Sequence, residues 1–224
     1  MEIEQFLYDL TEGGEAIVAY TMSGSSGAKV QLCNMGASVL SLTLASGRDI
    51  ASGRCVMGLE GLLGLDPKGN GEPFDERLWE SWVETNRVIM STAVSHRGVD
   101  LTMEVVFDFD DDDTFEITYQ AYAAEDVEFD LTHALSIDMG SDMEVAVSGT
   151  QLEDRDVYAI DGSRASILTH VAHLTSAMGN VEVCSSQPQL YHSSERKIIS
   201  PVSGLTPHLA ANHRYIHKSL FRLG

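Results

Sequence analysis

The side chains best suited to proton transfer lie in and near the stretch from Phe129 to Asp138, which contains one histidine, His133. An imidazole ionises near neutral pH and can act as a general acid or a general base. A carboxylate such as Asp138 or Glu116 could take the opposite role, but no spacing argument places these groups around one substrate. Because neighbouring residues of a strand face opposite sides, we favour a structural role for His133.

Residues of metal-ligand type are present but poorly arranged. His170 and His173 have the i,i+3 spacing that could hold a metal on a helix, yet residues 167–174 read equally well as a strand. The acidic run at 110–113 lacks the glycine and the spaced glutamate of a calcium loop, which favours a solvated hairpin tip. The three cysteines have no CxxC spacing. The sequence therefore predicts no metal site, no cofactor and buried free thiols.

The formal net charge of −20 is the strongest signal in the composition. Such a surface repels nucleic acid and anionic lipid, so we expect neither as a partner. The acidic residues are spread over most of the chain, which favours a role in solubility over an acidic face that docks on a basic partner. No apolar run reaches the length of a membrane span, and no secretory signal is visible. We expect a soluble protein in a reducing intracellular compartment: the cytoplasm, or an organelle if a targeting segment was removed.

The elements that must position these residues read as strands separated by turns. Alternation is clearest from Leu101 to Phe109 and from Phe115 to Ala121, where apolar side chains recur at every second residue. Further strands are predicted at residues 16–21, 28–33, 38–44, 125–131, 143–148, 157–160, 181–184 and 216–223. No long segment has helical periodicity, and no linker or repeat is visible. The pattern predicts an all-β protein, a large antiparallel β-sandwich in one domain over residues 1–224.

Four stretches resemble the aldose 1-epimerase, or galactose mutarotase, family in the same order along the chain. The first is a hairpin with an Asn-x-Gly-Ala turn at residues 34–37, and the second is the Phe-Asp-x-x-x-Trp segment that ends at Trp79. The central strands within 105–139 and the closing strand at 209–223 are the third and fourth. The resemblance implies a galactose mutarotase-like supersandwich, here in a shortened form.

The resemblance also implies where catalytic groups should lie. The family uses a histidine acid and a glutamate base to open and reclose a sugar ring. The family's histidine position falls on Ala134 in one alignment and on Ser136, as in the hexose-6-phosphate mutarotases, in the other. The histidine of its sugar-binding His-Gly-Gly segment falls on Lys68, and Glu195 lies in a polar turn rather than in the family's glutamate segment. The losses fall at the active site.

Sugar binding without turnover is a separate expectation. Arg77 can donate paired hydrogen bonds and the face of Trp79 suits sugar C–H groups, while Lys68 could add positive charge. Packing in the core is an equally good interpretation of Trp79 and Trp82.

Three hypotheses follow. The first is a catalytically degenerate mutarotase-fold protein that serves as a non-enzymatic binding or accessory subunit, with a protein partner or a larger complex. The second is a divergent aldose or hexose-phosphate 1-epimerase that uses His133. The third is a carbohydrate-binding module with a sugar ligand and no turnover.

Overall fold

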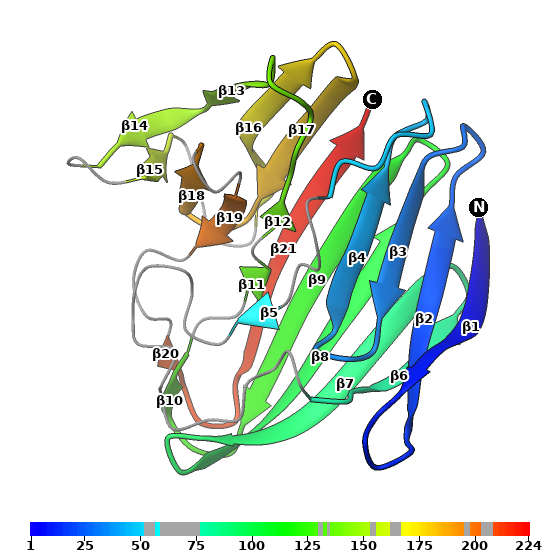
Figure 1. Ribbon diagram of the computed structural model, residues 1–224. Coiled ribbons are helices and arrows are strands. Elements are labelled where there is room, and N and C mark those ends of the chain that lie inside the picture. Colours follow the sequence, from blue (N-terminus) through cyan, green and yellow to red (C-terminus); the bar gives the residue numbers. More distant parts are fainter. Residues whose placement is uncertain are drawn as a thin grey trace.

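The computed structural model describes residues 1–51, 57–58, 77–129, 132–133, 135–152, 156–161, 167–194, 198–202 and 208–224. These residues form strands and turns and contain no helix (Figure 1). All paired strands are antiparallel, as the alternating sequence pattern predicted.

The largest element is an eight-stranded sheet with its longest strands at the centre. In spatial order its strands are β13 (Glu144–Val147), β16 (Thr169–Ser176), β17 (Gly179–Ser185), β21 (Arg214–Leu223), β9 (Thr114–Ala123), β8 (Val99–Phe109), β7 (Arg87–His96) and β6 (Glu80–Glu84). The alternation predicted for residues 101–109 and 115–121 is confirmed, because the apolar positions are buried and the intervening ones are not. One face of this sheet therefore points inward and the other outward.

A four-stranded sheet forms the second layer. Its strands follow chain order: β1 (Glu2–Leu10), β2 (Ala16–Ser23), β3 (Lys29–Cys33) and β4 (Ser38–Thr43). It lies in front of β8 and β9 in Figure 1. Met22, Leu32 and Leu42 share one buried cluster with Phe107 and Ile117. The predicted antiparallel β-sandwich is confirmed by this packing of two apolar faces.

The remaining strands form smaller sheets beside this sandwich. A five-stranded sheet contains β12 (Leu135–Ser136), β19 (Ile198–Val202), β18 (Gln189–Ser193), β15 (Val157–Ile160) and β14 (Gly149–Gln151) in that order. Two short pairs are β5 (Met57–Gly58) with β11 (Thr132–His133), and β10 (Val127–Glu128) with β20 (His208–Leu209). In Figure 1 the short strands β5, β11 and β12 are seen beside β21.

The acidic run between β8 and β9 is a hairpin tip, as predicted. Asp110 Oδ1 accepts hydrogen bonds from the backbone N–H groups of Asp112 and Thr114 at 3.0 and 2.9 Å. Ser26 Oγ donates to Asp113 Oδ1 at 2.6 Å and so ties the β2–β3 turn to this tip. These carboxylates order turns and join two hairpins.

Several sequence predictions of strand position need correction. The strand predicted over 125–131 is present at Val127–Glu128 but not at 125, 126 or 129, and the one predicted from 216 begins at Arg214. Residues 167–174 belong mostly to strand β16, so His170 and His173 are not on a helix. Strands β1, β7 and β19 were not predicted, because in them apolar residues do not simply alternate with polar ones. Cys33 is buried and Cys184 is half-buried, with no disulfide between them, and Cys55 lies outside the described residues.

Candidate functional site

The inward face of the two central strands holds a cluster of aromatic rings. Tyr119 on β9 is the register partner of His217 on β21, and their rings stack with centroids 4.1 Å apart and 21° between the planes. Tyr215 meets the His217 ring edge-on at 5.5 Å and meets Phe129, which follows β10, at 5.0 Å. Tyr119, His217 and Phe129 are buried and Tyr215 is partly buried. The central strands thus direct their rings at one another.

A polar segment between β17 and β18 closes one side of this aromatic cluster. The Gln187 amide donates from Nε2 to the Tyr215 hydroxyl at 2.9 Å, and its backbone N–H donates to Ser185 Oγ at 3.0 Å. Ser185 Oγ in turn donates to the Lys218 carbonyl at 3.2 Å. Gln187 and Ser185 are both buried, so these bonds hold the segment against β21. The result is an ordered polar wall beside the rings.

Acid–base chemistry on a sugar requires two ionisable groups that reach one substrate. The ten inward positions of β9 and β21 carry one imidazole, that of His217, and no carboxylate; they are Phe115, Ile117, Tyr119, Ala121, Ala123, Tyr215, His217, Ser219, Phe221 and Leu223. His217 is only 4% exposed, because the neighbouring rings cover it. This arrangement packs the His217 imidazole against the rings of Tyr119 and Tyr215.

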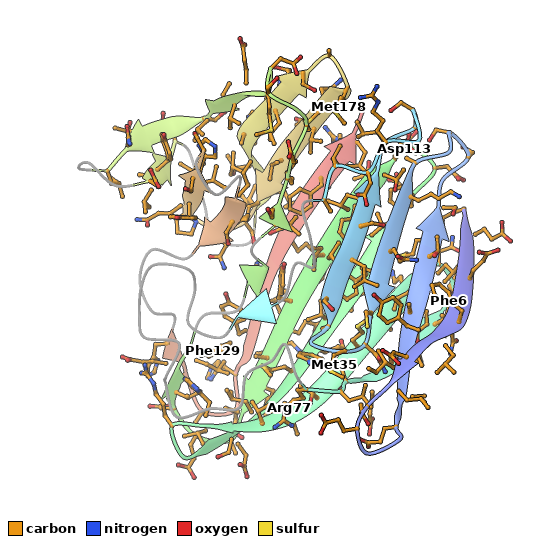
Figure 2. The ribbon with its side chains drawn as sticks, in the orientation of Figure 1. Phe6, Met35, Arg77, Asp113, Phe129 and Met178 are labelled. Atoms are coloured by element: carbon orange, nitrogen blue, oxygen red, sulfur yellow. The ribbon has the colours of Figure 1, made fainter. Side chains whose placement is uncertain are left out.

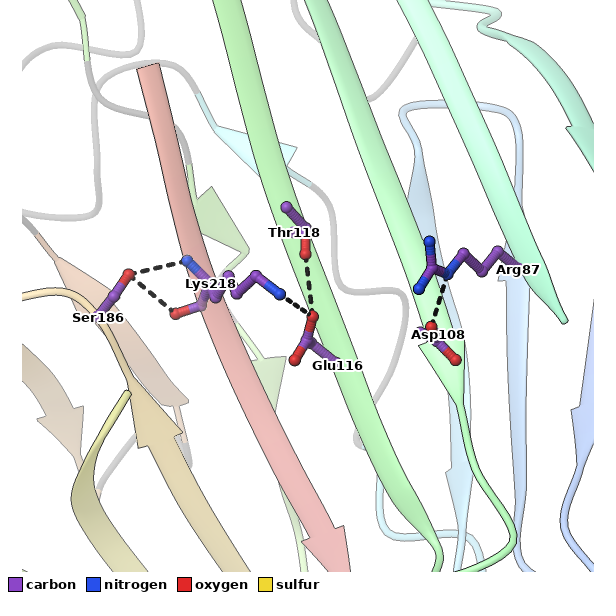
Figure 3. Close-up of polar contacts among 6 residues, drawn as sticks. All are labelled: Arg87, Asp108, Glu116, Thr118, Ser186 and Lys218. Carbon is purple, nitrogen blue, oxygen red and sulfur yellow. Dashed lines mark hydrogen bonds and ion pairs between the residues drawn. The ribbon is translucent and has the colours of Figure 1, made fainter. Parts of the chain in front are cut away.

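Glu116 and Asp138 are the carboxylates suggested for a divergent mechanism. Glu116 is on the outer face of β9, opposite to Tyr119, where its carboxylate accepts hydrogen bonds from Lys218 Nζ at 2.5 Å and from Thr118 Oγ1 at 3.1 Å (Figure 3). Asp138 follows β12, and its Oδ1 accepts from the backbone N–H of Gly140 at 3.0 Å. Glu116 therefore serves an ion pair on the far side of the sheet.

The described residues at and beside the family's histidine position lie on short strands. His133 belongs to β11, opposite Met57, and its side chain lies outside the described part of the chain, as does the whole of Ala134. Ser136 is half-buried on β12, where it pairs with Ile198. Its hydroxyl cannot replace an imidazole as an acid near neutral pH. Lys68 and Glu195 lie outside the described residues.

Arg77 and Trp79 lie just before β6 and do not form an open pair. Arg77 Nη1 donates to the Ala93 carbonyl at 3.0 Å, and the Arg77 carbonyl accepts from the N–H of Gly36, one residue after Met35 (Figure 2). Trp79 is 1% exposed and belongs to the hydrophobic core. Trp79 was considered for sugar stacking and for core packing, and its position corresponds to core packing. Trp82 is 41% exposed, so the core position considered for it is wrong.

His192, one of three buried histidines among the described residues, was not singled out in the sequence. It lies on β18, where its backbone N–H donates to the Asp156 carbonyl at 2.8 Å, and its side chain shares a sheet face with Leu190 and Ile199. Burial lowers the pKa of His192, and the nearby Asp156 carboxylate opposes this shift to a smaller extent. The apolar alternation through Leu190 could have indicated an inward histidine.

No metal centre is formed by the residues that the structure describes, since no three histidine, cysteine or acidic side chains converge there. His170 Nδ1 instead forms a 2.7 Å hydrogen bond with Ser148 Oγ. Among the same residues there is no helix of the length and apolar character that a membrane crossing needs.

Comparison with known proteins identifies the class to which this fold belongs. A galactose 1-epimerase from Lactobacillus acidophilus NCFM superposes with a TM-score of 0.75 at 10% identity, over 99% of this chain and 98% of that one. A galactose mutarotase-like protein from Clostridium acetobutylicum gives 0.70 at 9% identity, over 98% and 97%. An aldose epimerase homologue from C. elegans gives 0.65 at 13% identity, over 90% and 97%.

The chain therefore has the galactose mutarotase-like fold from one end to the other, as the sequence resemblance implied. No protein-family model matches the sequence. No curated protein matches it either. At these identities the likeness concerns the fold, and the question of function rests on the side chains.

Proposed function

We propose that this protein is a single-domain, catalytically degenerate mutarotase-fold protein that serves as a non-enzymatic binding or accessory subunit. The observation that carries the proposal is the inward face of β9 and β21, where ten described positions include no carboxylate and the one imidazole is stacked on Tyr119. The replacement of the family's histidine by Ala134 or Ser136 supports the same conclusion. A protein of this fold that lacks the catalytic acid and base keeps its binding surfaces but does not interconvert sugar anomers.

Polarimetry on freshly dissolved α-glucose and α-galactose tests the proposal. The rate constant of mutarotation should stay at the buffer value over a wide range of protein concentrations. A rate that rises in proportion to protein and disappears in His133→Ala, but not in the exposed-histidine control His213→Ala, would establish the divergent epimerase instead.

Calorimetry separates the two non-catalytic roles. A panel of hexoses and hexose phosphates should give no saturable heat if the protein is an accessory subunit. Saturable binding of one sugar, together with a mutarotation rate equal to that of buffer, would assign the carbohydrate-binding role. The net charge of −20 supports the first outcome for the phosphorylated sugars, because it repels anions.

A further inference from the structure

Strand β1 ends the four-stranded sheet and leaves one edge open. It pairs with β2 along one side, from Glu2 opposite Ser23 to Leu10 opposite Ala16. Within the described part of the chain no strand pairs with its other side. An open edge presents backbone N–H and C=O groups that another extended chain can pair with.

The side chains of this edge strand are unusually apolar for an exposed position. Phe6, Leu7, Tyr8 and Leu10 are 39, 62, 55 and 54% exposed. They make up four of the nine large hydrophobic side chains that are exposed among the described residues, and they lie within five consecutive positions. Figure 2 shows Phe6 at the margin of the front layer. A contiguous exposed apolar strand of this kind is typical of an interaction site.

The edge of the other layer reaches the same end of the sandwich. Strand β6 is the last strand of the eight-stranded sheet, and its Trp82 and Val83 are both 41% exposed. The Tyr20 hydroxyl donates to Ser81 Oγ at 2.8 Å, which joins β6 to β2 beside Gln5, the register partner of Tyr20. The two terminal strands β1 and β6 lie at the same end of the sandwich (Figure 1), and both carry exposed apolar side chains.

Charge determines which strand this edge can accept. Residues 1–28 contain five acidic residues and no lysine or arginine; the acids are Glu2, Glu4, Asp9, Glu12 and Glu15. Glu80 and Glu84 flank Trp82 on β6. A second copy of this chain would bring an equally acidic edge, and like charges across an interface oppose association. An extended segment that carries lysine or arginine would meet both the apolar side chains and the carboxylates.

We propose that β1 is a docking edge for an extended basic segment of a partner protein, which adds as a further strand to the four-stranded sheet. The backbone of β1 supplies the pairing, Phe6 and Leu7 supply apolar contacts, and the carboxylates at Glu2, Glu4 and Asp9 select basic side chains. This inference extends the proposed accessory role by naming the chemistry of its partner. Its test does not depend on sugar turnover, so either proposal can fail alone.

Synthetic nonapeptides provide the test with the full-length chain. The probe is acetyl-Lys-Val-Thr-Val-Lys-Val-Thr-Val-Lys-amide with a fluorophore, and its binding is followed by anisotropy at low salt. The same peptide with glutamate in place of lysine should bind at least about tenfold more weakly, because several carboxylate contacts become repulsive. Two further probes carry backbone N-methyl groups along one edge or along the other. Methylation of one edge should abolish binding, and methylation of the other should leave it unchanged.

Variants of the protein locate the site. The double variant Phe6→Ser with Leu7→Ser should lose binding without loss of fold, since both side chains are exposed. Ile167→Ser removes a 54% exposed side chain from outside this edge and should bind as the unmodified chain does. Glu2→Gln with Glu4→Gln should reduce the preference for the basic probe.

Three outcomes would overturn the proposal. The first is equal binding of both N-methylated probes, which would indicate charge attraction without strand pairing. The second is binding that survives the Phe6 and Leu7 substitutions. The third is a dimer by sedimentation that Leu7→Lys dissociates, because a second copy would then occupy the edge.

Discussion

His217 lies directly across the sheet from Tyr119, with the imidazole stacked on the phenol ring at 4.1 Å between centroids. Both side chains face the interior, and both are almost completely buried. The pair joins the closing strand β21 to the central strand β9 in the middle of the largest sheet. The stack therefore packs the imidazole of His217 against the phenol ring of Tyr119 inside the sheet.

Replacement of His217 should therefore lower stability. His217→Ala leaves a gap beside Tyr119 and Tyr215 and should reduce the free energy of unfolding by about 2–4 kcal/mol. Equilibrium unfolding in urea measures the loss. The exposed His213→Ala control should change the free energy by less than about 0.5 kcal/mol. A His217→Ala protein as stable as the control would contradict the packing role.

His192 should make stability depend on pH. Burial lowers the pKa of this imidazole below its ordinary value of 6.5, so the unfolded chain binds a proton at a higher pH than the folded chain does. The stabilising contribution of neutral His192 is complete above pH 6.5 and is lost as the pH falls from 6.5 toward the lowered pKa of the folded state.

His192→Gln removes this titration. Urea midpoints measured from pH 7.5 to pH 5 should fall more steeply for the unmodified chain than for the variant, because carboxylate titration is common to both. Parallel curves for the two proteins would show that His192 has the same pKa in the folded and unfolded states.

The sequence predicted the sheets where side chains strictly alternate, as they do through Met103, Val105 and Phe107, because a strand with one buried face must repeat every two residues. It failed at β1, where Phe6, Leu7 and Tyr8 are consecutive and exposed, since no inward face generates a pattern there. The open edge could be found only after the strand order was known.

For the candidate site too, some features could be predicted from the sequence and others only from the structure. The sequence alone predicts that Ala134 or Ser136 takes the place of the family's histidine, and this stays a prediction. The stack of Tyr119 on His217 could not be predicted, because the two residues are far apart in sequence and meet only through the β9–β21 register. Glu116 lies between the inward residues Phe115 and Ile117 of β9. The alternating sequence pattern therefore already indicated that its side chain faces outward.

Asn34, in the turn that carries part of the family resemblance, should be important for stability. Its Oδ1 accepts from the N–H of Val18 at 2.8 Å and its Nδ2 donates to the Trp79 carbonyl at 3.3 Å, so one buried amide joins β2 to the segment before β6. Asn34→Ala leaves both backbone groups without this partner and should cost about 2 kcal/mol.

Urea unfolding again provides the measurement for Asn34→Ala. The control is Gln31→Ala on the same hairpin, where a half-buried amide makes one long contact of 3.5 Å with Thr21 Oγ1 and where we expect a change of about 0.5 kcal/mol or less. Equal losses in the two variants would mean that the Asn34 hydrogen bonds add nothing to the fold.

The outer-face pair of Lys218 and Glu116 should make a small, salt-sensitive contribution. The two side chains are 43 and 27% exposed, so water screens an ion pair that joins β21 to β9. A double-mutant cycle with Lys218→Met and Glu116→Gln should give a coupling of about 0.5 kcal/mol that decreases as salt is added. The pair of Arg87 and Asp108, at 58 and 33% exposure, should give a smaller coupling in a parallel cycle. A coupling of several kcal/mol that does not respond to salt would instead require Glu116 to be buried.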